Sequence, residues 1–129
     1  MALNDPLANV LSHMNNQEKL GRNELTTKNN SKLIREVLKI MQDEQYIGSF
    51  EQLEDVYSSL KINLLGKINK CGVITPRFKV KVTEYEKYEK RFLPAMGFGM
   101  LLVSTSKGLM TNKKAKEMNL GGTLICYVY

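Results

Sequence analysis

The sequence predicts a mixed α/β fold of the α+β type, made of two small packed domains. Apolar residues recur mainly at helical spacing before Phe50, and the period then changes to two, as in strands with one covered face. A chain of 129 residues, 43% of them hydrophobic, suffices for one ordinary domain or two small ones. We expect helix-strand-helix-strand-strand in residues 1–66, and mainly antiparallel strands with a short helix in residues 67–129.

The N-terminal domain is expected to begin with an amphipathic helix. Asp5 can cap this helix and Pro6 fits its first turn. Its buried stripe consists of Leu7, Val10, Leu11 and Met14. A short strand is predicted at 24–28, and Ser31 can cap a second helix. The apolar face of that helix consists of Leu33, Ile34, Val37, Leu38 and Met41.

The remaining elements are predicted to be mostly strands. Leu60, Ile62 and Leu64 alternate with polar residues, and Gly66 marks the expected domain boundary. Further strands are expected at 67–74, 77–82 and 123–129, whereas the charged stretch 84–91 can be a short helix or an ordered loop. The apolar run 100–103 predicts a strand buried on both faces, and Thr111 can cap a helix over 112–119.

The segment from Gly99 to Lys116 gives the strongest indication of function in the sequence. Three hydroxyls follow the buried strand at Ser104, Thr105 and Ser106. Lys107 then adds a charge and Gly108 supplies the backbone freedom for a tight turn. This hydroxyl-rich turn and the lysine-rich start of the helix that follows it can bind an anion. The alternative is that the hydroxyls only satisfy turn and cap positions and that the lysines are merely solvated.

Charge favours a polyanion as partner. The chain has 19 Lys and Arg against 13 Asp and Glu, a formal charge of +6 and a pI near 9.3. Cations gather towards the C-terminal half, where Arg77, Lys79 and Lys81 alternate with apolar residues on a predicted strand. Such a face either binds phosphates or is simply a solvated sheet face.

Other classes of protein are not favoured. The sequence has no secretory signal and no apolar run long enough to span a bilayer, so we expect a cytoplasmic protein without a membrane partner. Cys71 and Cys126 are too few for a zinc site and are expected to be reduced and buried. His13 lies in a predicted helix with no cysteine nearby in sequence, and no phosphate-loop motif is present. We therefore expect no catalytic residue, no metal, no cofactor and no enzyme activity.

The pattern from Gly99 to Lys116 resembles the motif of the small-ribosomal-subunit proteins numbered eight. The glycine, the paired aliphatic residues, Ser104-Thr105, Gly108 and Ala115-Lys116 all occur at the family's spacing. The resemblance spans nearly the whole chain, from Asp5-Pro6 to the Gly121-Gly122 pair, and the stretch 69–78 is similar to the archaeal and eukaryotic cytosolic branch, archaeal by preference. Met96, Asn112 and Thr123 depart from residues common in the family.

The resemblance implies a structural component of the small ribosomal subunit, monomeric within the ribosome. It would bind the central domain of small-subunit ribosomal RNA, support assembly of that domain and contact neighbouring small-subunit proteins. The RNA-binding residues implied are Ser104, Thr105, Ser106, Lys107, Gly108, Thr111, Gly122 and Lys32. The first three would lie at the RNA minor groove, and Lys32 can equally be a solvated helix residue. The alternative function is an RNA-binding module outside the ribosome or a translational regulator.

Overall fold

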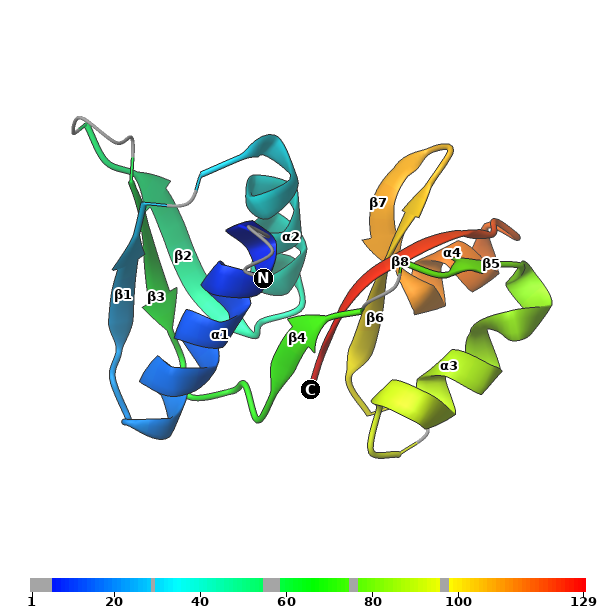
Figure 1. The fold of residues 1–129 in the computed structure, drawn as a ribbon, viewed down its shortest axis with the longest axis horizontal. Coiled ribbons are helices and arrows are strands. Elements are labelled where there is room, and N and C mark those ends of the chain that lie inside the picture. The colour runs from blue at the N-terminus through cyan, green and yellow to red at the C-terminus, as the bar shows by residue number, and fades with distance from the viewer. Residues whose placement is uncertain (1–5, 29, 55–58, 75–76, 96–97) are drawn as a thin grey trace, which may run out of the picture. The chain divides into compact units, whose positions relative to one another are not determined.

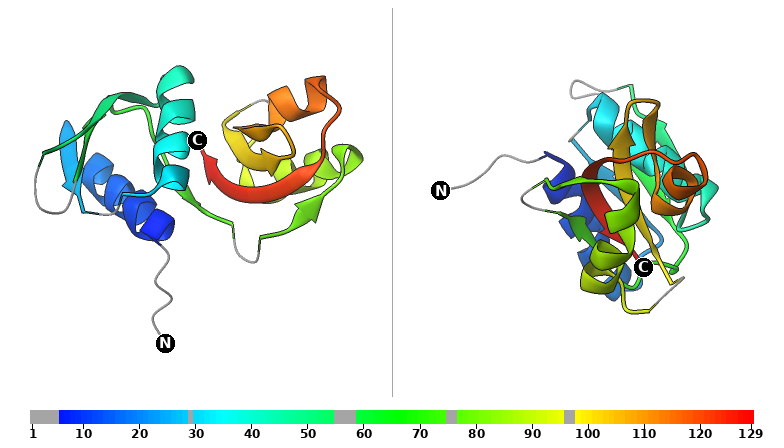
Figure 2. Two further views of the ribbon diagram at one scale, coloured as in Figure 1. Left: turned by 90° about the horizontal axis from the view of Figure 1, so that it is seen from above. Right: turned by 90° about the vertical axis from the view of Figure 1, so that its right-hand side faces the viewer.

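The computed structural model describes residues 6–28, 30–54, 59–74, 77–95 and 98–129 (Figures 1 and 2). The chain divides into two compact units, Met1–Asn69 and Lys70–Tyr129. Each unit combines helices with an antiparallel sheet, which confirms the predicted α+β class. The predicted cap Asp5 and the departing residue Met96 lie outside the described residues.

The first unit has the predicted order of elements. It consists of α1 (Pro6–Lys19), β1 (Glu24–Thr27), α2 (Lys32–Asp43), β2 (Ile47–Gln52) and β3 (Leu60–Leu64), with strand order β1-β3-β2. Ser31 caps α2 as predicted, because its Oγ accepts a hydrogen bond from the Ile34 amide at 3.2 Å. The predicted stripe of α1 is buried, as are four of the five predicted residues of α2, Leu33 being half-buried.

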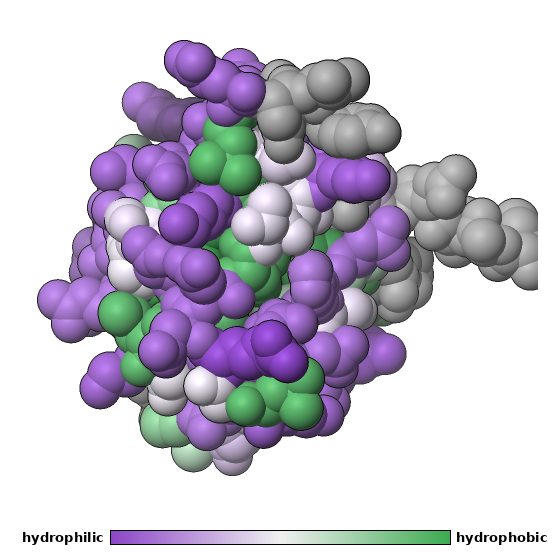
Figure 3. All heavy atoms as spheres, turned by 90° about the vertical axis from the view of Figure 1, so that its left-hand side faces the viewer, coloured by the Kyte–Doolittle hydropathy of each residue, from purple (hydrophilic) through white to green (hydrophobic). Residues whose placement is uncertain are grey.

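Polar side chains cover much of the outside of this unit. Ser49 and Asn63 form a hydrogen bond at 2.7 Å, and Lys61 pairs with Glu24 at 3.5 Å. Seen from the side drawn in Figure 3, the surface is mainly hydrophilic, with apolar side chains in separate spots. The coloured part of this face, which is the part that the structure describes, therefore shows no single broad apolar surface for a partner.

The second unit is built around a long curved strand, β8 (Gly122–Val128) (Figure 2). This strand pairs with β4 (Cys71–Val73), β5 (Lys79–Val80) and β6 (Met100–Thr105), and β6 pairs with β7 (Gly108–Thr111). Two helices, α3 (Tyr85–Phe92) and α4 (Asn112–Glu117), complete the unit within the described residues. Every strand pairing in the unit is antiparallel, as predicted.

Several elements of the second unit differ from their predicted extents. The strands expected at 67–74 and 77–82 are shorter in the structure, as β4 and β5. Soon after β5 a 3₁₀ turn at Val82–Glu84 ends the extended backbone and leads into α3. The charged stretch 84–91 is therefore helical. The helix predicted over 112–119 ends at Glu117.

The first four residues of β6 are buried on both faces of the sheet, which confirms the prediction from the apolar run. Met100 is 5% exposed, and Leu101, Leu102 and Val103 are 0% exposed. Leu101 and Val103 belong to a core with Tyr85 of α3 and Ala115 of α4. Burial on both faces fixes the position of the residues that follow β6.

Asn112 joins β6 to both helices of the unit. Its Oδ1 accepts a hydrogen bond from the buried Leu101 amide at 3.1 Å. Its Nδ2 donates to Glu89 Oε1 at 2.7 Å, and the same carboxylate oxygen pairs with Lys116. The ladder between β6 and β7 ends at Leu102 and Thr111. The Leu101 amide, one residue beyond that ladder, finds its acceptor in the Asn112 side chain instead of in β7.

Replacing Asn112 with alanine is expected to destabilise the protein by about 1–3 kcal/mol, because the buried Leu101 amide loses its partner. The change Lys113→Ala on the exposed side of α4 serves as control and should shift stability by less than about 0.5 kcal/mol. Urea unfolding measures both values. Equal effects of the two substitutions would show that the Asn112 hydrogen bonds contribute nothing specific.

Candidate nucleic-acid interface

The strands β6 and β7 form a tight hairpin. Thr105 pairs with Gly108, which leaves Ser106 and Lys107 as the turn. Gly108 has φ +108°, a conformation that glycine adopts without strain. A turn followed by one residue with positive φ is a common hairpin connection. The three predicted hydroxyls thus occupy a strand end and a turn, not a continuous turn as expected from the sequence.

The Thr105 hydroxyl is used within the hairpin. Its Oγ1 donates to the Gly108 carbonyl at 2.8 Å and accepts from the Lys107 amide at 3.1 Å. These two bonds close the turn from inside, and only acceptor capacity remains on this oxygen. Thr105 therefore shapes the hairpin first and has less to offer an external ligand than its serine neighbours.

The side chains of Ser104, Ser106 and Lys107 are exposed at the end of the hairpin. Neither serine hydroxyl makes a hydrogen bond to another of the residues that the structure describes. Both hydroxyls can therefore donate to and accept from a ligand. The hairpin presents two free hydroxyls and one ammonium group on a well-anchored support.

Gly122 allows β8 to pack closely against β6. A Cβ atom at this position would lie 2.3 Å from the Ser104 carbonyl oxygen and 2.8 Å from Val103 Cγ1. No side chain fits at such distances. Gly122 thus has a packing role beside the site, and its contact with RNA stays a prediction.

The other two predicted residues lie away from the turn. Thr111 caps α4 as predicted, since its Oγ1 accepts from the Lys114 amide at 3.2 Å. Lys32 is exposed in the first turn of α2, in the first unit. The structure therefore groups Ser104, Thr105, Ser106, Lys107 and Gly108, with Gly122 beside them.

Sheet pairing adds two neighbours that were not among the predicted site residues. Thr123 of β8 pairs with Ser104 on one side and with Lys79 of β5 on the other. Directly opposed residues share a face of an antiparallel sheet. Lys79, Thr123 and Ser104 therefore form a polar column leading away from the hairpin. The alternation of 77–82 gave a signal for Lys79, but the sequence does not reveal which strand lies beside it.

The other reactive groups that the structure describes form no comparable site. His13 is half-buried in α1 and its Nε2 lies 3.3 Å from Gln17 Nε2. Both cysteines are buried thiols, and burial raises the pKa of Cys126 well above its usual range. Among the residues described, no three His, Cys, Asp or Glu side chains gather as metal ligands. None of the described helices has the length and apolarity to cross a bilayer.

Comparison with known protein families supports the resemblance found in the sequence. The family model described as ribosomal protein S8 matches residues 5–129, nearly the whole chain. The match includes both units and the entire hairpin. It confirms the resemblance inferred from the sequence.

Replacing Thr105 with valine is expected to destabilise the protein by about 0.5–1.5 kcal/mol, because both internal hydroxyl bonds are lost while the branched shape is kept. Ser106→Ala should cost less than about 0.5 kcal/mol, since its hydroxyl supports nothing in the hairpin. Urea unfolding measures the stability of both variants, and hydrogen exchange reports protection of the Lys107 amide. An unchanged amide in the valine variant would refute the internal role of Thr105.

Proposed function

The chain belongs to the ribosomal protein S8 family and is a small-subunit ribosomal protein that binds ribosomal RNA, and from this premise we propose how it binds. The hairpin residues Ser104 and Ser106 read the minor groove of an RNA helix, while Thr105 holds them in place. The RNA segment belongs to the central domain of the small-subunit RNA, and binding supports the assembly of that domain. The protein acts as a monomer within the ribosome, beside other small-subunit proteins.

The chemistry of the exposed serines fits an RNA minor groove. This groove is wide and shallow in A-form helices and presents 2′-hydroxyls and base edges. A short hydroxyl side chain reaches such groups only if the backbone comes close. Gly108 has no neighbouring atom within 4 Å of where its Cβ would lie, so its surface is open to an approaching ligand.

The rigidity of the hairpin supports specific recognition. Ser104 directly follows four buried residues of β6, and Ser106 lies in a turn closed by Thr105. Both hydroxyls are therefore positioned before the RNA arrives, which limits the entropy lost on binding. This preorganised pair of free hydroxyls is the observation that carries the proposal.

Positive charge around the hairpin supports phosphate contacts. Lys107 lies in the turn, and Lys79 lies at the far end of the polar column through Thr123. Their side chains are exposed. Phosphate contacts fix the orientation of the RNA while groove contacts give the specificity.

Ser104→Ala and Ser106→Ala are each expected to weaken binding to small-subunit ribosomal RNA by about 1–3 kcal/mol, because a buried polar partner on the RNA loses its bond. Unrelated duplex RNA should bind with little change. Ser12→Ala, which removes an exposed hydroxyl from α1, is the matched control. Filter binding or fluorescence titration measures the affinities. Equal losses for both RNAs, or none, would refute groove reading by the hairpin.

Lys79→Ala is expected to weaken binding to all RNAs and to lower the slope of log affinity against log salt concentration by roughly 0.7–0.9. The control Lys39→Ala removes an exposed lysine that pairs with Asp43 on α2. Titrations at several salt concentrations give both slopes. A slope unchanged by Lys79→Ala would exclude a phosphate contact at the end of the polar column.

A further inference from the structure

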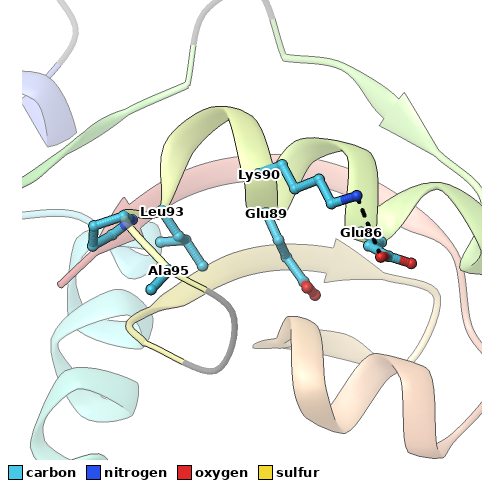
Figure 4. A pocket seen from close by; sticks show the side chains of 6 residues that line it. Glu86, Glu89, Lys90, Leu93 and Ala95 are labelled. Carbon is cyan, nitrogen blue, oxygen red and sulfur yellow. Dashed lines mark ion pairs between the residues drawn. The ribbon is translucent and has the colours of Figure 1, made fainter.

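Helix α3 separates its charged residues into two stripes. Glu86 and Lys90 form an exposed ion pair at 3.6 Å, and Glu89 turns inward to Asn112 and Lys116. Glu86, Glu89 and Lys90 line a pocket of about 210 Å³ together with Leu93, Pro94 and Ala95 (Figure 4). Both carboxylates of α3, Glu86 and Glu89, thus lie on the pocket side of the helix. The charged residues of α3 on the other stripe are cations.

The other stripe combines cations with aromatic rings. Arg91 lies over two rings, with its guanidinium carbon 5.2 Å from the centroid of Phe78 and 5.4 Å from that of Phe92. Lys87, one turn earlier, lies over Tyr88 at 5.5 Å. We call Phe78, Lys87, Tyr88, Arg91 and Phe92 the arginine–aromatic surface.

The rings hold Arg91 in a defined orientation. Phe78 also packs against Tyr88 at 5.3 Å between centroids, and Phe92 stacks on Tyr127 at 5.7 Å. Both rings are therefore anchored in the unit. Arg91 is exposed and forms no ion pair with any carboxylate that the structure describes. A guanidinium that lies over aromatic rings keeps its N–H groups available for an oxyanion.

This surface is distinct from the hairpin. Leu93, which directly follows α3, lies against Gly99 at the start of β6, whereas the hairpin turn follows the end of β6. Six strand residues separate these positions, a span of roughly 20 Å. Figure 1 likewise draws the C-terminal end of α3 near the beginning of β6 and far from the turn.

We propose that Arg91 binds an RNA phosphate at this arginine–aromatic surface, as a second RNA contact of the protein. The site would take the backbone of a ribosomal RNA segment other than the one that the hairpin reads. That the ligand is RNA follows from family membership, which the proposed function also uses. That the contact lies at this surface follows from the environment of Arg91. It stands or falls independently of the groove contacts of Ser104 and Ser106.

Charge favours RNA over an acidic protein as the occupant. Arg91 and Lys87 place two exposed cations on this stripe, and neither pairs with a carboxylate that the structure describes. Two cations supported by aromatic rings suit a phosphate backbone, because a guanidinium can donate two parallel hydrogen bonds to one phosphate group. The chain also already binds ribosomal RNA as a member of its family.

The test compares Arg91→Ala with Lys90→Ala, its neighbour on the pocket side of α3. Both remove one exposed cation from the same helix. We expect Arg91→Ala to weaken binding to complete small-subunit ribosomal RNA about tenfold and to lower the salt slope by roughly 0.7–0.9. Lys90→Ala should leave both unchanged. Arg91→Met keeps the apolar stem against the rings and serves if the alanine variant unfolds.

A double variant separates this site from the hairpin. The losses from Arg91→Met and Ser106→Ala should add, because the two residues lie at distant positions of the unit. Unchanged RNA affinity in a folded Arg91 variant would overturn the proposal. So would intact RNA affinity combined with reduced incorporation into ribosomal particles, because that result assigns the surface to a protein partner.

Discussion

The burial of β6 on both faces is the constraint on which the candidate interface depends. Met100 to Val103 lie inside the unit, and Ser104 to Gly108 extend directly from them into solvent. Ser104 directly follows this packed run, and Ser106 lies in the turn that the Thr105 hydroxyl closes. The core and the turn together therefore place the backbone that carries the two exposed hydroxyls.

The motif that carries the family resemblance contains two kinds of residue. Thr105, Thr111 and Asn112 make internal hydrogen bonds that close the turn, cap α4 and complete the ladder of β6. The hydroxyls of Ser104 and Ser106 make no hydrogen bond with described residues, and both side chains are exposed. A hydroxyl-rich run thus divides into supporting and presenting residues, a division that sequence spacing alone does not reveal. In our proposal the supporting residues reduce the entropic cost of recognition.

Local patterns predicted much of the fold, and tertiary pairing limited the rest. The stripes of α1 and α2, the Ser31 and Thr111 caps and the buried run of β6 depend on residues close in sequence. The lengths of β4 and β5 depend on how far β8 accompanies them, which no local pattern contains. The polar column of Ser104, Thr123 and Lys79 could not be predicted either, because it arises from the pairing of β8 with β6 and β5. Asn112 was noted only as a departure from the family, because its partners Leu101 and Glu89 are distant in sequence.

The most direct test of the account pairs each serine with a single 2′-hydroxyl of the RNA. Affinities are measured for wild type and Ser106→Ala against RNA with and without one 2′-deoxy substitution, scanned along the bound helix, and likewise for Ser104→Ala. The account predicts a position where the two changes are not additive, with a coupling of about 1 kcal/mol or more. Additive losses at every position would contradict recognition of the minor groove by this hairpin.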